Sequence, residues 1–252
     1  AQDISAKGVS VAAVIDSRDI APVAKIPHAQ IVMGAGVMNT SGRKALKDIT
    51  LTTGQRITTD CLAVSGGWNP NIHLTCHQRG RPSWSEALNA FVPGSDLPPG
   101  MQVVGAAQGD LTLSKSISSA HQKAKKIAKD LGFTATRKAA PKASDEASTG
   151  MSFWHVSVNK TRAWIDLQND VTVKDIRQSY QEGFRSVEHL KRYTTLGMAT
   201  DQGKTSNIPA LAIMAECTGK TIPETGTTVF RPPYTPVPMG ALAGRARGKS
   251  FR

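Results

Sequence analysis

Apolar residues recur at helical spacing in the C-terminal third of the chain. Val187, Leu190 and Tyr193 share one face of a predicted helix, and Gly197 ends this helix. A second and almost wholly apolar helix is predicted over residues 208–217. Two helices joined by a short polar turn therefore form the centre of this region.

Capping residues set the boundaries of the predicted helices. Asn207 is the predicted N-cap of the second helix, and Pro209 is tolerated in its first turn. A third helix is predicted over residues 173–182, with Thr172 as N-cap and Gly183 at its end. Two predicted strands lead into this region, over residues 154–158 and 163–167.

Strands and turns alternate in the N-terminal half. The strands are predicted over residues 8–16, 31–40, 44–53, 55–64 and 101–104, and a long helix over residues 113–131. The first strand ends in Asp16, which is the pattern of a second Rossmann strand whose terminal carboxylate meets a ribose. The Gly-rich turn that normally precedes such a strand is absent. We therefore expect the chain to begin inside a nucleotide-binding domain.

Small residues follow the last of these predicted strands. Gly105 and Gly109 flank the start of the long helix, where a bound nucleotide could approach the backbone and the helix dipole favours an anion. Close packing of a strand against a helix also requires small residues, so this motif alone does not distinguish a nucleotide site from ordinary packing. Residues 82–91 are predicted to form a short helix or an exposed connection, with Trp84, Leu88 and Phe91 on one side.

The order of elements predicts an α/β protein. An incomplete FAD/NAD(P)-binding, Rossmann-like domain is expected over residues 1–133, and a small, mainly helical domain over residues 161–222. Between them, residues 134–160 are rich in Ala, Lys and Ser and are predicted to be a basic flexible linker. Five prolines make residues 223–252 an extended arm with a basic tail, of a kind that usually lies on a neighbouring domain or subunit.

Composition and charge exclude several classes of protein. The chain is 39% hydrophobic, and it contains neither a membrane-spanning run nor a signal-peptide pattern, so we expect a cytoplasmic protein. The net charge of +12 arises almost wholly from residues 112–142 and 245–252. Neither segment carries interleaved aromatic residues or a nucleic-acid motif, so a solvated helix face and a linker explain the charge better than a nucleic-acid partner.

The cysteines and histidines predict no metal site. Three scattered cysteines are too few for a disulfide framework and suit a reducing compartment. His73, Cys76 and His77 could begin a metal site, but no further ligands follow nearby. A short helix after the turn at residues 66–70, with one of these residues packed inside, is the preferred interpretation.

The turn between the two C-terminal helices carries the strongest candidate chemistry. Gly203 frees the backbone, while Lys204, Thr205, Ser206 and Asn207 offer one cation and several hydrogen-bonding groups at a helix N-terminus. Such a turn suits a phosphate, because unpaired amides and the helix dipole both favour an anion. It is not a P-loop, since Met198 stands where that motif needs glycine. The alternative is an ordinary turn whose hydroxyls only cap helices.

Two blocks of sequence resemble one family. FRSVEHLKRYTTLGMATDQGKTSN, followed by FRPPYTPVPMGALAGR, resembles the alpha subunits of heterotetrameric sarcosine oxidases, within a wider group of multi-subunit amine and proline dehydrogenases. CLAVSGGWNPNIHLTCHQRGRPSWSEALNAFVPG resembles the same subunits independently, and the blocks occur in the family's order. The resemblance covers most of the chain except the region around residues 112–160.

The resemblance implies a flavin-dependent oxidoreductase acting on CH–NH bonds, in sarcosine catabolism. The amine-oxidising site and its FAD would belong to the beta subunit, with gamma and delta subunits completing the complex, so no catalytic residue is assigned here. This chain would contribute an NAD site with Asp16, Gly105 and Gly109. It would also contribute one wall of an FMN site at the interface with the beta subunit, formed by Lys191, Arg192, Thr195, Lys204, Thr205, Ser206 and Asn207.

The resemblance also bears on an iron–sulfur cluster and on folate binding, neither of which is expected in this chain. The helical domain of related flavoenzymes holds an iron–sulfur cluster through four cysteines, whereas this region has Cys217 alone, so no cluster is expected. The family's folate-binding domain would follow the arm, so tetrahydrofolate is expected only through that further domain. Two alternatives stay open: a non-catalytic scaffold of an amine dehydrogenase complex, and a stand-alone NAD-dependent reductase, which would need the absent phosphate loop.

Overall fold

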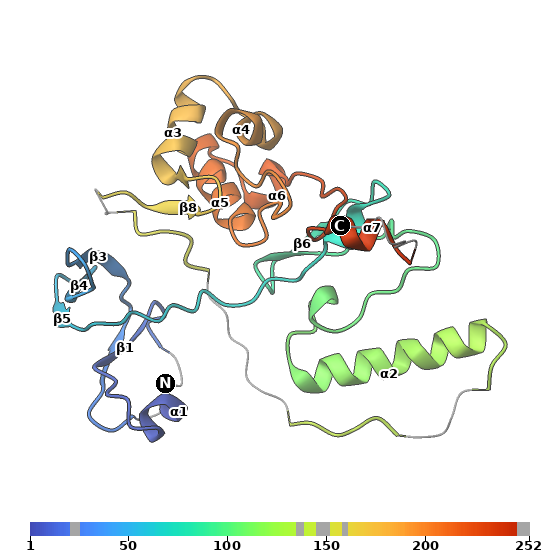
Figure 1. Ribbon diagram of the computed structural model, residues 1–252, viewed down its shortest axis with the longest axis horizontal. Helices are drawn as coiled ribbons and strands as arrows, with labels where there is room; N and C mark the ends of the chain where they lie inside the picture. The colour runs from blue at the N-terminus through green and yellow to red at the C-terminus, as the bar shows by residue number, and fades with distance from the viewer. Residues whose placement is uncertain (21–25, 135–138, 145–151, 158–160, 246–252) are drawn as a thin grey trace. The chain divides into compact units, whose positions relative to one another are not determined.

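A computed structural model describes residues 1–20, 26–134, 139–144, 152–157 and 161–245 (Figure 1). The chain forms two compact units of mixed α/β structure. The first comprises Ala1–Gly67 and Thr149–Ala163, and the second comprises Trp68–Ser148 and Trp164–Arg252. The predicted division into residues 1–133, 134–160, 161–222 and 223–252 stays a prediction. Within the described residues, no helix combines the length and apolar character that crossing a membrane requires.

The first unit consists of a short helix and two small sheets. After α1 (Gln2–Ala6), β1 (Ala13–Asp16) pairs in parallel with β2 (Gln30–Met33). An antiparallel meander follows, with β3 (Val37–Ser41), β4 (Asp48–Leu51) and β5 (Arg56–Thr58) in that order. Ala35, Ile49 and Leu51 form the buried core, and partly buried residues of both sheets pack against it. The meander confirms the alternation read from the sequence.

The predicted strand over residues 31–40 is divided into β2 and β3. Gly34 takes a left-handed φ of +63°, and a side chain there would lie 2.7 Å from the Oδ1 atom of Asp19. An added Cβ at Gly36 would lie 2.8 Å from the ring of Phe153. These close approaches break the strand between its two halves.

The second unit begins with short elements. The predicted short helix after residues 66–70 is confirmed as η1 (His73–Cys76), a 3₁₀ turn. The prediction for residues 82–91 is wrong, because β6 (Ser83–Ser85) and β7 (Ala90–Val92) form an antiparallel hairpin. Trp84 and Phe91 face one another across it with ring centroids 5.0 Å apart. Such a cross-strand aromatic pair stabilises a hairpin.

The long predicted helix is confirmed as α2 (Leu113–Asp130), with Thr112 as its N-cap. The predicted strand at residues 101–104 does not form, and the chain instead passes into η2 (Gly105–Gln108). A strand needs a neighbour for its backbone groups. Among the described residues, no strand lies beside residues 101–104 to accept or donate such bonds. The Lys123 ammonium instead donates hydrogen bonds to the carbonyl of Val103, at 2.7 Å, and to the side-chain oxygen of Gln108.

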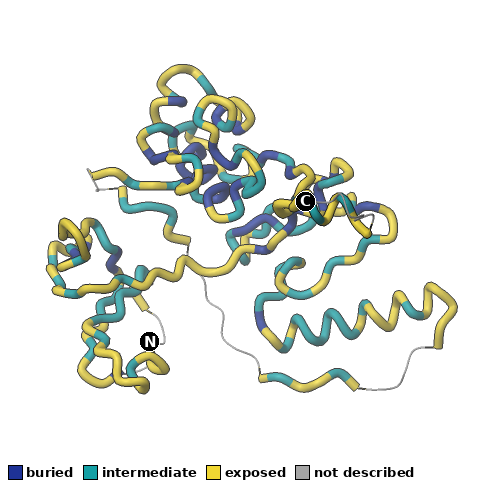
Figure 2. The backbone as a smooth tube through the Cα atoms, viewed as in Figure 1, coloured by how far each residue is buried: buried dark blue, intermediate teal, exposed yellow. Residues whose placement is uncertain are grey.

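A helical cluster forms most of the rest of the second unit (Figures 1 and 2). A small hairpin of β8 (Trp164–Asp166) and β9 (Val171–Thr172) leads into three helices: α3 (Val173–Gln181), α4 (Val187–Thr194) and α5 (Asn207–Thr218). Of the two strands expected there, the second is thus confirmed, whereas residues 154–157 are not a strand and residue 158 lies outside the described residues.

Burial and capping explain the helical cluster. Ile176, Leu190, Leu211, Ile213 and Met214 are fully buried. Figure 2 shows several dark blue, buried segments within this cluster. A helix that is apolar on nearly all sides, as α5 is, belongs inside a protein. The predicted Thr172 cap is confirmed as one half of a capping box with the Asp175 carboxylate.

The Pro-rich segment continues the second unit. It contains α6 (Ile222–Thr225) and α7 (Met239–Leu242), with irregular chain between them. Phe230 is buried, and Thr227 accepts a hydrogen bond from Asn207 of α5 at 3.0 Å. This part of the predicted arm therefore packs within its own unit. The expected linker lies partly outside the described residues, and the tail after residue 245 lies wholly outside them.

Candidate functional site

The turn between α4 and α5 is tightly folded around two glycines. Left-handed φ angles occur at Thr195, Gly197, Ala199, Gln202 and Gly203. A Cβ added at Gly197 would lie 3.3 Å from the backbone of Gly203, and one added at Gly203 would lie 2.9 Å from the Cβ of Asn207. A side chain at Gly203 would therefore clash with Asn207, and one at Gly197 would make a tight contact, so close approach favours glycine at both positions in addition to its conformational freedom.

A buried carboxylate fixes one side of this turn. Asp166, at the end of β8, accepts the Gly197 amide at 2.8 Å through Oδ2. It also accepts the backbone amides of Gln168 and Asn169 and the side-chain amide of Asn169. Burial alone would raise the pKa of Asp166, but these hydrogen bonds together lower it. The charged carboxylate thus joins the β8–β9 hairpin to the turn.

The N-terminus of α5 is enclosed. Ser206 occupies the N-cap position and is 1% exposed, while Asn207, the predicted N-cap, is the first residue of the helix and is also buried. The shift of one residue follows from the amide of Asn207 donating to the carbonyl of Gly203. The Ser206 hydroxyl has no hydrogen-bond partner among the described residues.

Two side chains of the turn attach the Pro-rich segment. The Lys204 ammonium donates to the carbonyl of Tyr234 at 2.8 Å and lies 4.8 Å from the centroid of its ring. The amide nitrogen of Gln202 donates to the carbonyls of Arg231 and Pro233, and its oxygen accepts the Arg231 amide at 2.8 Å. The segment is therefore held mainly through its backbone.

His73 joins the same assembly from a distant part of the sequence. Its ring stacks on that of Phe230 with the centroids 3.8 Å apart, and its Nδ1 atom donates to the side-chain oxygen Oδ1 of Asn71 at 2.9 Å. The Asn71 amide in turn donates to the Tyr234 hydroxyl at 2.5 Å. Burial, reinforced by the charge of Lys204, lowers the pKa of His73 to about 4. The imidazole is therefore neutral at pH 7, and its stacking on Phe230 gives it a structural role here.

A small internal cavity lies at this junction. Its volume is about 20 Å³, and its polar lining includes His73, Lys204 and Asn207. The Nε2 atom of His73 is buried and has no partner with hydrogen-bonding geometry among the described residues. A space of this size suits a water molecule rather than a phosphate group.

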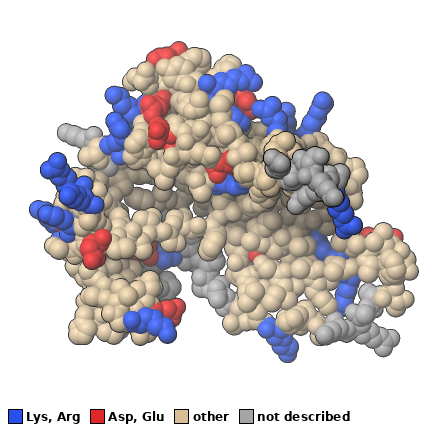
Figure 3. Space-filling view, in the orientation of Figure 1, with Lys and Arg blue, Asp and Glu red and all other residues tan. Residues whose placement is uncertain are grey.

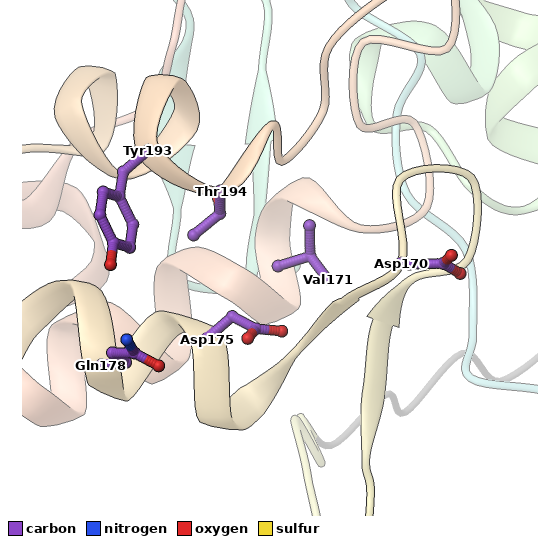
Figure 4. Close-up of a pocket in the computed structure, with 6 residues that line it drawn as sticks. All are labelled: Asp170, Val171, Asp175, Gln178, Tyr193 and Thr194. Atoms are coloured by element: carbon purple, nitrogen blue, oxygen red, sulfur yellow. The ribbon is translucent and has the colours of Figure 1, made fainter.

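A larger hollow of about 510 Å³ lies between α3, α4 and the β8–β9 turn (Figure 4). It is lined by Asp170, Val171, Asp175, Gln178, Tyr193 and Thr194. None of the residues predicted to bind a cofactor lines it. The Asp175 carboxylate already caps α3, and the two acidic side chains disfavour an anion. This hollow is therefore not the phosphate-binding site expected from the sequence.

Basic side chains gather near the end of α4, over which Lys and Arg are visible in Figure 3. Burial lowers the pKa of Lys191, and the charges of Arg231 and Arg192 lower it further, while Glu188 opposes them. Arg192 and Arg231 are exposed. The charges of Arg192 and Arg231, which come from two segments of the chain, therefore both act on the Lys191 ammonium.

The seven residues predicted for the FMN wall form two groups. Ser206 and Asn207 are buried, and Lys204 is bonded to the Pro-rich segment. Lys191, Arg192, Thr195 and Thr205 are partly or fully exposed. The sequence did not mark Gln202, Arg231 or Tyr234, although the last two lie in the FRPPY stretch of the quoted blocks.

The residues predicted for NAD lie in both units. Asp16 ends β1, and Arg18 binds its carboxylate through both Nε and Nη2, at 2.9 and 2.6 Å. The Arg18 hydrogen bonds lower the pKa of Asp16. Gly105 is the first residue of η2 and Gly109 is its C-cap, both with left-handed φ angles. A Cβ at Gly109 would lie 2.7 Å from the Leu88 side chain, so packing accounts for this glycine. The described residues contain no cluster of three or more His, Cys, Asp or Glu suited to a metal ion.

Comparison with known proteins supports the resemblance found in the sequence. Residues 160–245 match the family described as "Sarcosine oxidase A3 domain". The sarcosine oxidase subunit alpha of Rhizobium meliloti (strain 1021) is 40% identical over 257 residues, which cover 100% of this chain and 26% of that protein. The chain is homologous to part of sarcosine oxidase subunit alpha. The resemblance predicted from the sequence is thus confirmed.

Two further sarcosine oxidase alpha subunits agree. Those of Corynebacterium sp. strains P-1 and U-96 are 33% and 34% identical, over 98% of this chain and 28% of each protein. The chain therefore spans about a quarter of the length of these alpha subunits. The crystal structure of L-proline dehydrogenase from P. horikoshii aligns with a TM-score of 0.66 and 20% identity, over 85% of this chain and 45% of that one. This likeness shows a shared fold.

Proposed function

We propose that this chain is part of the alpha subunit of a multi-subunit, flavin-dependent sarcosine oxidase, an oxidoreductase acting on CH–NH bonds. The observation that carries the proposal is the homology with sarcosine oxidase alpha subunits along the whole chain. We place the complex in the cytoplasm. The amine-oxidising site and its FAD belong to a beta subunit in this proposal, and this chain alone is inactive.

An FMN shared with the beta subunit is the proposed cofactor of the turn. A phosphate group needs cations and hydrogen-bond donors that it can reach. The exposed part of the turn fits this requirement, since it offers Lys191, Arg192, Thr195 and Thr205. When bound, the flavin supplies the capacity to accept electrons removed from the amine.

The buried members of the predicted set have a supporting role in this proposal. Ser206 and Asn207 fix the start of α5 beneath the turn, and the cavity beside Asn207 is too small for a phosphate. Lys204 would have to exchange its bond with the Tyr234 carbonyl for one with the phosphate. Its ammonium has three donors, so it can also use another of them.

NAD is the second proposed cofactor. Asp16 has the position of a ribose acceptor at the end of a strand in a parallel pair. Each of its oxygens can accept more than one hydrogen bond, so Arg18 does not exhaust them. Gly105 and Gly109 belong to the same proposed site, and Gly105 is the one where the dinucleotide would approach the backbone, because Leu88 packs against Gly109. Gamma and delta subunits complete the proposed complex, without an iron–sulfur cluster and with tetrahydrofolate bound only by a further domain.

The test is to purify the chain with and without a beta subunit and to measure the FMN released from each sample, separately from the FAD of the beta subunit. The proposal predicts FMN in the co-purified sample only. FMN in neither sample would favour the alternative, a non-catalytic scaffold of an amine dehydrogenase complex.

A matched pair of variants tests the turn itself. Lys204→Ala in the assembled complex should weaken FMN retention by about 1.5–3 kcal/mol, the value of a charge-assisted hydrogen bond. Lys220→Ala removes the same charge from an exposed position after α5 and should leave retention unchanged. Full FMN occupancy of the Lys204 variant under dilution would exclude this residue from the site.

A further inference from the structure

The end of β1 carries a carboxylate and a guanidinium that are joined to one another. Arg18 donates to Oδ1 of Asp16 from its backbone amide and its Nε atom, at 3.0 and 2.9 Å, and to Oδ2 from Nη2 at 2.6 Å. The bond from the backbone amide alone would form an ordinary turn after a strand. The two bonds from the guanidinium go further, because they form a paired contact that offsets the charge of the carboxylate.

Backbone contacts fix this pair at the carboxyl end of two parallel strands. Strands β1 and β2 run in parallel, with Asp16 opposite Met33. Beyond them, the Arg18 carbonyl accepts the Gly34 amide at 2.9 Å, and the Asp16 carbonyl accepts the Ala35 amide at 3.2 Å. Ligands of open parallel sheets bind at such ends. The side chains of Arg18 and Asp16 are 29% and 17% exposed, so a ligand can reach both of them.

The pair limits what the carboxylate can still accept. A carboxylate has about four acceptor positions, two on each oxygen. Among the described residues, the bonds from Arg18 occupy both positions of Oδ1 and one position of Oδ2. One position therefore remains for a ribose hydroxyl. A free carboxylate at this place would also repel a phosphate on the neighbouring hydroxyl, and here the charge of Arg18 offsets that repulsion.

We infer that Arg18 determines the specificity of the proposed NAD site, and that this site accepts NADP as well as NAD. NADP keeps the 3′-hydroxyl of its ribose, which can use the remaining position on Asp16, and an arginine at the strand end accommodates the 2′-phosphate. The carboxylate of Asp19 lies nearby, beside Gly34, but it is exposed and solvent screens its charge. This inference rests on the proposed function, which supplies the NAD site itself.

The test measures binding rather than turnover. NAD and NADP are titrated separately into the full chain purified with the beta subunit, and calorimetry gives the dissociation constant of each nucleotide. The two constants should lie within about tenfold of one another, which corresponds to no more than a single hydrogen bond. Raising the ionic strength should weaken the binding of NADP more than that of NAD, because NADP carries an additional phosphate.

Variants of matched charge identify the role of Arg18. Arg18→Gln restores the full charge of Asp16 and should weaken NADP binding by about tenfold or more, while NAD binding changes by less than about twofold. Arg18→Lys keeps the charge without the planar fork and should lie between wild type and Arg18→Gln. Arg43→Gln removes the same charge from an exposed position of the same unit and should leave the ratio of the two constants unchanged.

Melting temperatures show whether each variant has folded. If Arg18→Gln does not fold, Arg18→Lys still tests the inference, because it alters the geometry of the contact and keeps its charge. A folded Arg18→Lys variant that binds NADP as tightly as the wild type would show that the planar fork is not used.

The outcomes separate this inference from the proposed function. NADP binding that Arg18→Gln weakens selectively supports the assignment. NAD binding with NADP at least about a hundredfold weaker overturns it and leaves the proposed NAD site intact. An equal effect of Arg18→Gln on both nucleotides also overturns it, because Arg18 then makes no difference to the 2′-phosphate. Binding of neither nucleotide overturns the NAD site together with this inference, while the release of FMN still tests the rest of the proposed function.

Discussion

Helices α2 and α5 illustrate two ways in which a sequence forms a helix. The apolar residues of α2, from Leu113 to Ile127, form one stripe along it, and none of its residues is buried. Helix α5 is apolar on nearly every side, and eight of its twelve residues are buried (Figure 2). The start of α2 is fixed locally by Thr112 and Asp110, whereas the start of α5 is enclosed by segments from distant parts of the chain. Local pattern therefore suffices for α2, and tertiary burial stabilises α5.

Truncation of a core side chain should give the sharpest contrast. Leu211→Ala in α5 should lower the free energy of unfolding by about 2–5 kcal/mol, because Leu211 is fully buried and a cavity would remain. Ile127→Ala in α2 should cost less than about 1 kcal/mol, because Ile127 is 39% exposed. Urea denaturation of both variants provides the measurement. Equal losses would show that α2 packs as tightly as α5.

The second prediction concerns His73, which helps to enclose the start of α5. The folded state holds the pKa of His73 at about 4, against about 6.5 for an unfolded chain. Between these values the unfolded chain binds the extra proton, so this contribution to stability is lost as the pH falls from about 6.5 to 4. The loss should reach roughly 3 kcal/mol.

His73→Phe isolates this effect. Phenylalanine can still stack on Phe230 and does not titrate. Urea denaturation of wild type and variant at several pH values between 4 and 7 should therefore show a flatter dependence for the variant. Parallel curves would mean that His73 is not buried in solution.

The third prediction concerns Asp166, which holds the turn before α5. Asp166→Asn should cost about 1.5–3 kcal/mol, because the amide cannot accept all the hydrogen bonds that the carboxylate accepts. The lowered pKa means that this stabilisation is present above about pH 4 and is lost as the pH falls through the folded value. Asp170→Asn, at an exposed position nearby, is the control and should cost less than about 0.5 kcal/mol. Thermal melts at pH 7 compare the two.

The fourth prediction compares the two ends of α5. Gly203 and Gly219 have φ angles of +71° and +66°, so alanine is strained by about 1–2 kcal/mol at either position. At Gly219 the added Cβ meets open space, whereas at Gly203 it would lie 2.9 Å from the Cβ of Asn207. Gly203→Ala should therefore be the more destabilising by denaturation. Equal costs would show that the turn can relax away from α5.

The sequence predicted α2, α3, α4 and α5 because their signals are local, whereas the short helices α6 and α7 were not predicted. Thr172 and Ser186 both cap helices, and the apolar spacing of α3 and α4 shows directly in the residues. The β6–β7 hairpin was missed because its turn has no glycine and relies on Asn89 in a left-handed conformation. The expected strand at residues 101–104 did not form, because a strand depends on a partner that its own sequence does not specify.

The candidate site was predicted only in part, for a related reason. Lys204, Ser206 and Asn207 were identified as a group, but their burial depends on Asn71, His73 and the segment from Thr227 to Tyr234. Asn71 and Tyr234 are 163 positions apart in the chain. No short-range pattern indicates such a contact. The division of the turn into a buried and an exposed part could therefore only come from the structure.

The bonding of Gln202 has a consequence for how this region can change during evolution. A glutamine that recognises only main-chain atoms places no demand on the side chain opposite it. Position 231 could then acquire residues of any charge or size while the segment keeps its course. Selection at that position would reflect what the side chain binds, and selection at position 202 would reflect the fold.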